Sequence, residues 1–171
     1  IHNKNQLTKL SQIQFVETHK QQKYLEKVSN KLHVSNHNAK QAMSQKAKEL
    51  NLNSEIYSET ILGRIDEVAK SLNSNLNTGQ IRFGGGEPSI VAYKNILGKG
   101  GRNSQLTLES LPFLQDGQVF ISLASDGLDN SNMAGAIADS HSMARIKDSF
   151  DYENQRLNLD SFPVFEKLDD L

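Results

Sequence analysis

The sequence predicts an α/β protein in which a largely parallel or mixed sheet lies between layers of helices, in a Rossmann-like α/β/α arrangement. Three observations carry this prediction. From residue 31 onward, short strand-like runs alternate with helical patterns at the spacing of βα units. An apolar content of 36% over 171 residues is enough for one globular core. Glycine-rich turns follow two of the predicted strands.

The first thirty residues have a different character from the rest. They are predicted to be helical but poorly amphipathic. Their apolar residues form two short stripes, Leu7, Leu10, Ile13 and Val16, then Tyr24, Leu25 and Val28. We therefore expect residues 1–30 to be a helical linker or the remainder of an amino-terminal domain, and residues 31–171 to be the α/β domain.

The βα units begin at residue 31, where β-branched and apolar residues alternate with capping residues and helical patterns. The expected elements are a strand at Leu32–Ser35, a helix over Ala39–Leu50 capped by Asn36 or Asn38, a strand at Ser54–Ser58, a helix over Gly63–Leu72 and a strand at Gln80–Phe83.

The stretch from Ile81 to Ser104 holds more than half of the chain's eleven glycines. The strand at Gln80–Phe83 leads into Gly84, Gly85 and Gly86, and Glu87 lies at that bend. A second short strand is predicted at Ser89–Tyr93. It is followed by the glycine loop Gly98–Asn103, which opens into a helical pattern of leucines. The rest of the chain is interpreted as scaffold around this stretch.

A glycine loop that opens into a helix is a potential anion site, because free N–H groups and the helix dipole favour negative charge there. Arg102 adds a planar fork that suits phosphate or carboxylate. Neither loop matches the P-loop or the dinucleotide-binding pattern. The alternative is a pair of tight turns with a solvated Arg102 and with Glu87 as a loop cap.

The most apolar strand is predicted at Gln118–Ala124, and we expect it to be buried. It ends in Ser125, Asp126, Gly127, Leu128 and Asp129. An acid at the carboxyl end of such a strand points into the crevice where these folds bind ligands, which selects Asp126. Near the end of the chain, Phe162, Phe165 and Leu168 are predicted to form the core-facing stripe of a helix.

The composition excludes several classes of function. The chain has no cysteine, so it has no disulfide, thiolate metal site or cysteine nucleophile. No transmembrane run or signal peptide is apparent, which favours a cytoplasmic location without a membrane partner. Residues 1–50 carry nine Lys and three Glu, whereas residues 51–171 are acidic. The lysines are interleaved with polar residues and lack an aromatic platform, so no nucleic-acid partner is expected.

Several motifs in order resemble the carboxyl-terminal domain, often called MOFRL, of the glycerate 2-kinase family. They are GGGEPSI, GKGGRNSQL, a strand ending in SDGLD, and MAGAIAD. The segments VSNHNAKQAMSQKAKELN and LNLDSFPVFEKLDDL also resemble the family. The resemblance covers about residues 31–171.

This resemblance implies an ATP-dependent kinase that phosphorylates the 2-hydroxyl of D-glycerate, or of a related hydroxy acid, in a cleft between two domains. The matched positions are Gly85, Gly86 and Glu87 in the first loop, Gly100, Gly101, Arg102 and Asn103 in the second, and the acids Asp126 and Asp129. Arg102 and Asp126 are the catalytic candidates, the loop residues bind substrate or phosphate, and the two acids suit Mg²⁺.

The larger amino-terminal domain of the family does not lie within these 171 residues. We therefore expect an amino-terminal kinase domain as a partner, with ATP and Mg²⁺ as cofactors. The alternative is a non-catalytic α/β module that binds a ligand or docks on another domain, with structural glycine loops. The sequence alone leaves open whether the chain is an enzyme.

Overall fold

The computed structural model describes residue 18 and residues 20–58, 60–90 and 98–171. The chain divides into two compact units, residues 1–33 and 34–171. Within the described part of the first unit, the single regular element is the 3-10 helix η1 (Gln22–Tyr24), and none of its residues is buried. This element is much shorter than the helix predicted over residues 1–30, of which residues 1–17 and 19 lie outside the described residues.

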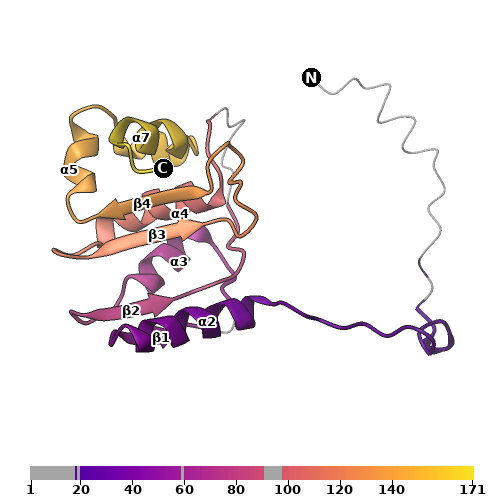
Figure 1. Ribbon diagram of the computed structural model, residues 1–171. Coiled ribbons are helices and arrows are strands. Elements are labelled where there is room, and N and C mark those ends of the chain that lie inside the picture. The colour runs from indigo at the N-terminus through magenta and orange to yellow at the C-terminus, as the bar shows by residue number, and fades with distance from the viewer. Residues whose placement is uncertain (1–17, 19, 59, 91–97) are drawn as a thin grey trace, which may run out of the picture. The chain divides into compact units, whose positions relative to one another are not determined.

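The second unit contains helices and strands in alternation, which confirms the predicted α/β class (Figure 1). Its elements are α2 (Asn36–Glu49), β1 (Asn53–Ile56), α3 (Ile65–Leu72), β2 (Gln80–Phe83), α4 (Arg102–Ser110), the 3-10 helix η2 (Leu111–Phe113), β3 (Val119–Leu123), β4 (Gly135–Asp139), α5 (Ser142–Lys147), α6 (Tyr152–Leu157) and α7 (Ser161–Leu168). None of the helices in the described ranges is both long and apolar enough to cross a membrane.

Helix α2 begins three residues earlier than the sequence predicts. Ser35 is its N-cap, and the Ser35 hydroxyl accepts a hydrogen bond from the backbone N–H of Asn38 while the Asn38 side chain accepts one from the Ser35 N–H. The strand predicted at Leu32–Ser35 is wrong. Leu32 and Val34 are exposed and pair with no strand in the described ranges, so alternation of apolar residues was not sufficient to form a strand without an adjacent edge.

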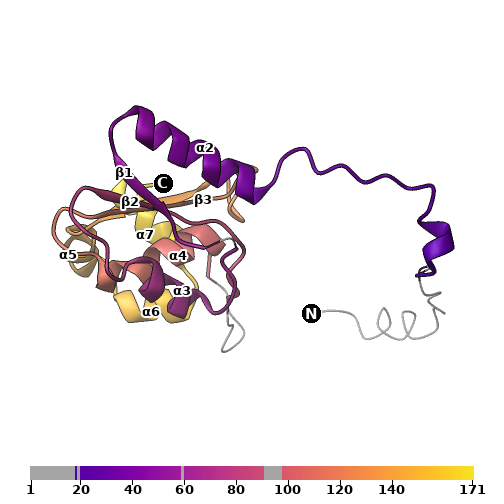
Figure 2. The same cartoon turned by 90° about the horizontal axis from the view of Figure 1, so that it is seen from below.

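The strands form a parallel pair and an antiparallel pair. β1 pairs with β2 in parallel, with Ile56 opposite Phe83, and β3 pairs with β4 in antiparallel fashion, with Ile121 opposite Ile137. Figure 2 shows α2 on one side of the strands and α3, α4 and α6 on the other. The predicted mixed, layered arrangement is therefore present.

Helix α4 lies at the centre of this unit. All residues from Ser104 to Ser110 are buried. Leu108 packs in a cluster with β4, α5 and α7, while Leu106 packs in a second cluster with α3. Of the stripe predicted on α7, Phe162 and Phe165 are buried, and Leu168 is half-buried and packs against the same core. Because each cluster includes a leucine of α4, this helix is packed into the core on two sides.

Strand β3 is not buried on both faces, contrary to the sequence prediction. Val119, Ile121 and Leu123 are 59%, 56% and 61% exposed, whereas Ser122 is buried against α4. The run from Val119 to Ala124 is apolar except for Ser122. Successive side chains of a strand face opposite sides, and within the described residues no helix covers the face that carries Val119, Ile121 and Leu123. Strand β4, in the MAGAIAD motif, was not foreseen as a strand.

Candidate functional site

One ion pair joins the two glycine loops. Glu87 follows β2 through the Gly84–Gly86 turn, and Arg102 is the first residue of α4. Nη1 of Arg102 lies 2.9 Å from Oε1 of Glu87, and the two side chains are 43% and 73% exposed. The guanidinium is thus oriented by one carboxylate while much of its surface faces solvent, which leaves donors for a ligand.

The first loop is held by the segment that follows β1. The N–H of Ile61 donates to the carbonyl of Gly85, and the N–H of Glu87 donates to the carbonyl of Ile61, both at 2.9 Å. The Asn36 amide also donates to the Gly85 carbonyl at 2.8 Å. A Cβ on Gly86 would lie 2.1 Å from the Ile61 carbonyl oxygen, so Gly86 is required by the close approach of these two backbones.

The second loop is held by polar side chains from other parts of the chain. The Lys99 N–H donates to Asp160 at 2.7 Å, and the Asn130 amide donates to the Gly100 carbonyl at 3.0 Å. A Cβ on Gly100 would lie 2.2 Å from the Ser161 hydroxyl. The sequence offered no pattern that singles out Asn130, Asp160 or Ser161, because these residues lie about 30 to 60 positions further along the chain and only the fold brings them to this loop.

Asp129 fills the amino-terminal end of α4. Its buried carboxylate accepts hydrogen bonds from the backbone N–H groups of Asn103 and Ser104, both at 2.8 Å. It also accepts bonds from the Asn103 amide at 3.1 Å and the Ser104 hydroxyl at 2.9 Å. Two of the N–H groups that were expected to face a ligand are therefore already bonded to an internal anion.

Asn103 is likewise engaged within the protein. In addition to its bonds to Asp129, its amide oxygen accepts a hydrogen bond from the Ser122 hydroxyl of β3 at 2.7 Å. Further along α4, Glu109 lies beside Gln105 and Arg156, and burial raises the pKa of the Glu109 carboxyl while these two neighbours oppose the shift. These polar contacts fix α4 in place.

Asp126 lies in a turn after β3 and is exposed. One of its oxygens accepts a hydrogen bond from the Leu128 N–H at 3.2 Å, and the turn passes through Gly127 at a φ of 84°. Across the described part of the chain, no three His, Asp or Glu side chains gather in a way that could hold a metal ion. The predicted set thus divides: Arg102, Glu87 and Asp126 face outward, whereas Asn103 and Asp129 face the protein.

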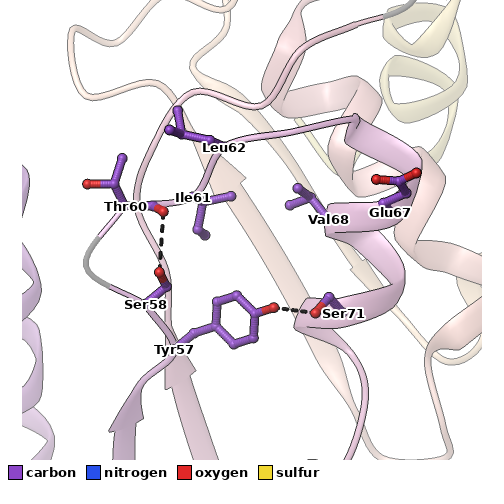
Figure 3. Close-up of a pocket in the computed structure, with 8 residues that line it drawn as sticks. All are labelled: Tyr57, Ser58, Thr60, Ile61, Leu62, Glu67, Val68 and Ser71. Carbon is purple, nitrogen blue, oxygen red and sulfur yellow. Dashed lines mark hydrogen bonds between the residues drawn. The ribbon is translucent and has the colours of Figure 1, made fainter.

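A separate depression of about 310 Å³ lies between the segment after β1 and α3 (Figure 3). It is lined by Tyr57, Ser58, Thr60, Ile61, Leu62, Glu67, Val68 and Ser71. The Tyr57 and Ser71 hydroxyls are hydrogen-bonded to each other, and Ser58 donates to the Thr60 carbonyl. The remaining polar side chains of the depression are Thr60 and Glu67, and the Glu67 carboxylate lies 3.7 Å from Arg64.

Comparison with known proteins gave one family and two solved structures. The model of the MOFRL family matches residues 81–171. The structure of the PH0495 protein from Pyrococcus horikoshii is similar, with a TM-score of 0.71 and 20% identity over 86% of this chain. The structure of a glycerate kinase from Thermotoga maritima is similar, with a TM-score of 0.70 and 24% identity over 79% of this chain.

In both cases the match covers 36% of the solved chain, so this sequence spans little more than a third of their length. At these identities the likeness concerns the fold alone. A comparison with curated protein sequences gave no significant match.

Proposed function

The chain belongs to the MOFRL family, and from this premise we propose that it is the carboxyl-terminal part of an ATP-dependent glycerate 2-kinase. The reaction would transfer a phosphoryl group from ATP to the 2-hydroxyl of D-glycerate or a related hydroxy acid. An amino-terminal domain would form the other wall of the cleft. The name of the structurally similar Thermotoga maritima protein supports the substrate class.

One observation carries the proposal: the Arg102 guanidinium reaches Glu87 across the two glycine loops and remains 43% exposed. Phosphoryl transfer needs positioning and charge stabilisation more than covalent chemistry from the protein. A guanidinium oriented by a carboxylate and fixed at the start of a buried helix can make a bidentate contact to a phosphoryl group. Arg102 is therefore assigned to the transferring phosphate.

The residues present fit a magnesium nucleotide at one acid. Mg²⁺ in such sites is held by one or two carboxylates and retains several waters. Asp126 is exposed and uses one oxygen for a turn, so it can offer its carboxylate to the ion. When bound, the ion would neutralise charge on the phosphates. Glu87 orients Arg102 through their ion pair, and Asn103 supports the loop through Ser122.

Calorimetry of the purified chain with Mg-ATP and with D-glycerate tests this proposal. We expect weak binding of Mg-ATP that is lost in Arg102→Gln and retained in Lys147→Gln. Lys147 is an exposed cation in the last turn of α5, outside both glycine loops, so its replacement removes one positive charge without changing the proposed site. Equal affinity for Mg-ATP in both variants would show that Arg102 does not contact the nucleotide.

The second candidate function is a non-catalytic α/β module. It is favoured by the glycine packing, because at Gly86, Gly100 and Gly101 the space that a Cβ would occupy is filled by the protein's own atoms rather than left open for a ligand. Absence of binding for both Mg-ATP and D-glycerate, in a chain with a cooperative melting transition, would favour this module over the kinase.

A further inference from the structure

The geometry points to Asp129 as a positioning residue, which fixes the first turn of α4 and thereby presents Arg102 to a phosphoryl ligand. On this inference Asp129 does not hold Mg²⁺, although its place in the SDGLD motif made it a candidate for that role. The identity of the ligand rests on the proposed function. The hydrogen bonds by which Asp129 holds Asn103 and Ser104, which we call the Asp129 clamp, are contacts within this chain.

The carboxylate of Asp129 has no acceptor capacity to spare. A carboxylate offers about four lone-pair sites. Oδ1 accepts from the backbone N–H and the amide of Asn103, and Oδ2 accepts from the backbone N–H and the hydroxyl of Ser104, at 2.8 to 3.1 Å. A metal ion at this position would have to displace these donors from a residue that is 5% exposed, and the Ser104 N–H and hydroxyl are themselves buried. Those donors would then be left without partners.

The same turn fixes the backbone on the other side of Arg102. A Cβ on Gly101 would lie 2.0 Å from the Asp129 carbonyl oxygen, so the two backbones are in close contact. Asn130, the next residue, donates its amide to the Gly100 carbonyl. The residues on both sides of Arg102, Gly101 and Asn103, are therefore held in place. This fixes the position of the Arg102 Cα, from which the side chain extends to Glu87. Such support reduces the entropy lost when the guanidinium binds.

Charge alone predicts the opposite influence on a ligand. A carboxylate at the amino-terminal end of α4 offsets the helix dipole and repels an incoming phosphate. Removing that charge should therefore strengthen phosphate binding if position did not matter. The positioning role predicts instead that removing the charge weakens phosphate binding. The sign of the change in phosphate affinity therefore distinguishes the positioning role from a purely electrostatic one.

The first measurement uses the unmodified chain. Mn²⁺ favours the same carboxylate ligands as Mg²⁺ and broadens nearby NMR signals. We expect Mn²⁺ to broaden the signals of Asp126 and Gly127 at concentrations that leave the amide signals of Asn103 and Ser104 sharp. Broadening of Asn103 and Ser104 at or before Asp126 would overturn the inference, because it would place the ion at Asp129.

The second measurement compares Asp129→Asn with Asp116→Asn, a matched change at an exposed turn residue. Amide exchange at Asn103 and Ser104 should become at least about tenfold faster in Asp129→Asn, the equivalent of one charge-assisted hydrogen bond. Exchange at Ile137, whose N–H donates to the Asp170 carbonyl at 2.9 Å, should remain much slower than at these two amides, which shows that the variant is folded. The affinity for inorganic phosphate, measured with EDTA present, should fall several-fold in Asp129→Asn and stay unchanged in Asp116→Asn.

An unchanged or higher phosphate affinity in Asp129→Asn would overturn the positioning role. EDTA removes any explanation through a bound metal. If the unmodified chain bound no phosphate at all, the proposed function would be contradicted, and the manganese and exchange measurements would still decide whether Asp129 is a clamp.

Discussion

The two glycine loops look alike in the sequence but are built differently in the structure. The loop at Gly84–Glu87 is held mainly by a parallel backbone segment at Ile61, which it meets through two N–H to carbonyl bonds. The loop at Gly98–Asn103 is held by side chains that come from residues 129–130 and 160–161. The first loop belongs to the sheet layer, whereas the second is a junction of distant segments. Arg102 links them, so the site depends on both kinds of support.

The largest difference between the loops should appear on adding a methyl group. In Gly101→Ala the new Cβ would lie 2.0 Å from a backbone oxygen of Asp129, which cannot move without breaking the cap of α4. In Gly85→Ala the nearest atom, also at 2.0 Å, is the Oδ1 end of the Asn36 side chain, which can rotate away. We expect Gly101→Ala to lower the free energy of unfolding by about 3 kcal/mol or more and Gly85→Ala by about 1 kcal/mol.

Urea denaturation of both variants checks this pair. The control is Gly117→Ala, where no atom crowds the Cβ but φ is +76°, so the cost is backbone strain alone, about 1 kcal/mol. Equal losses in Gly101→Ala and Gly85→Ala would mean that the second loop can shift as easily as Asn36 can turn.

A smaller effect is expected from Arg102→Lys. Lysine keeps the charge but loses the planar fork, so it cannot contact Glu87 and a phosphate in the same way. We expect the affinity for Mg-ATP to fall by about tenfold, with a change in unfolding free energy within about 0.5 kcal/mol. Calorimetry beside a melting curve measures both quantities. Unchanged affinity would indicate that Arg102 supplies only a diffuse positive charge.

The smallest effect is expected from Glu87→Gln. The ion pair with Arg102 is largely exposed, and pairs of this kind contribute at most about 1 kcal/mol in water. The free energy of unfolding should therefore change by less than about 0.5 kcal/mol, while phosphate affinity falls slightly because the Arg102 guanidinium is no longer oriented by a carboxylate. A large loss of stability would show instead that the two loops depend on this bridge, and added salt in the unmodified chain would then produce a similar loss.

Local sequence pattern was sufficient for elements whose support is local. Strand β2 begins and ends where the sequence predicted, at Gln80 and Phe83. Helix α2 was found within three residues, but the predicted cap at Asn36 or Asn38 is wrong, because Ser35 is the N-cap and Asn38 is the other member of the capping box. The segment Leu32–Ser35 has an equally good strand pattern but no partner edge in the described residues, and the pattern carries no information about partners.

Prediction of the candidate site from the sequence was limited in the same way, because local pattern does not show which distant residues lie beside it. Arg102, Glu87 and Asp126 were selected from the sequence, and the structure leaves all three accessible. That Asp129 faces inward while Asp126, three residues earlier, faces solvent could not be predicted, because the difference depends on α4 lying beside the turn. The prediction of a buried β3 was wrong for a related reason. The apolar residues of the run indicate that the strand is suited to burial, but they do not show whether a helix covers each of its faces. The roles of these residues in catalysis and metal binding stay predictions.

The packing of the glycines affects how relatives of this chain should be compared. Gly86, Gly100 and Gly101 are small because another part of the same molecule lies against them, so a descendant that had lost all chemistry would still need them in order to fold. A search that relies on the glycines will therefore collect active and inactive members alike. Arginine at position 102 and an exposed acid at position 126 are under no such packing constraint. If the proposed function holds, their loss in a relative would be an earlier sign than loss of a glycine that the relative is inactive.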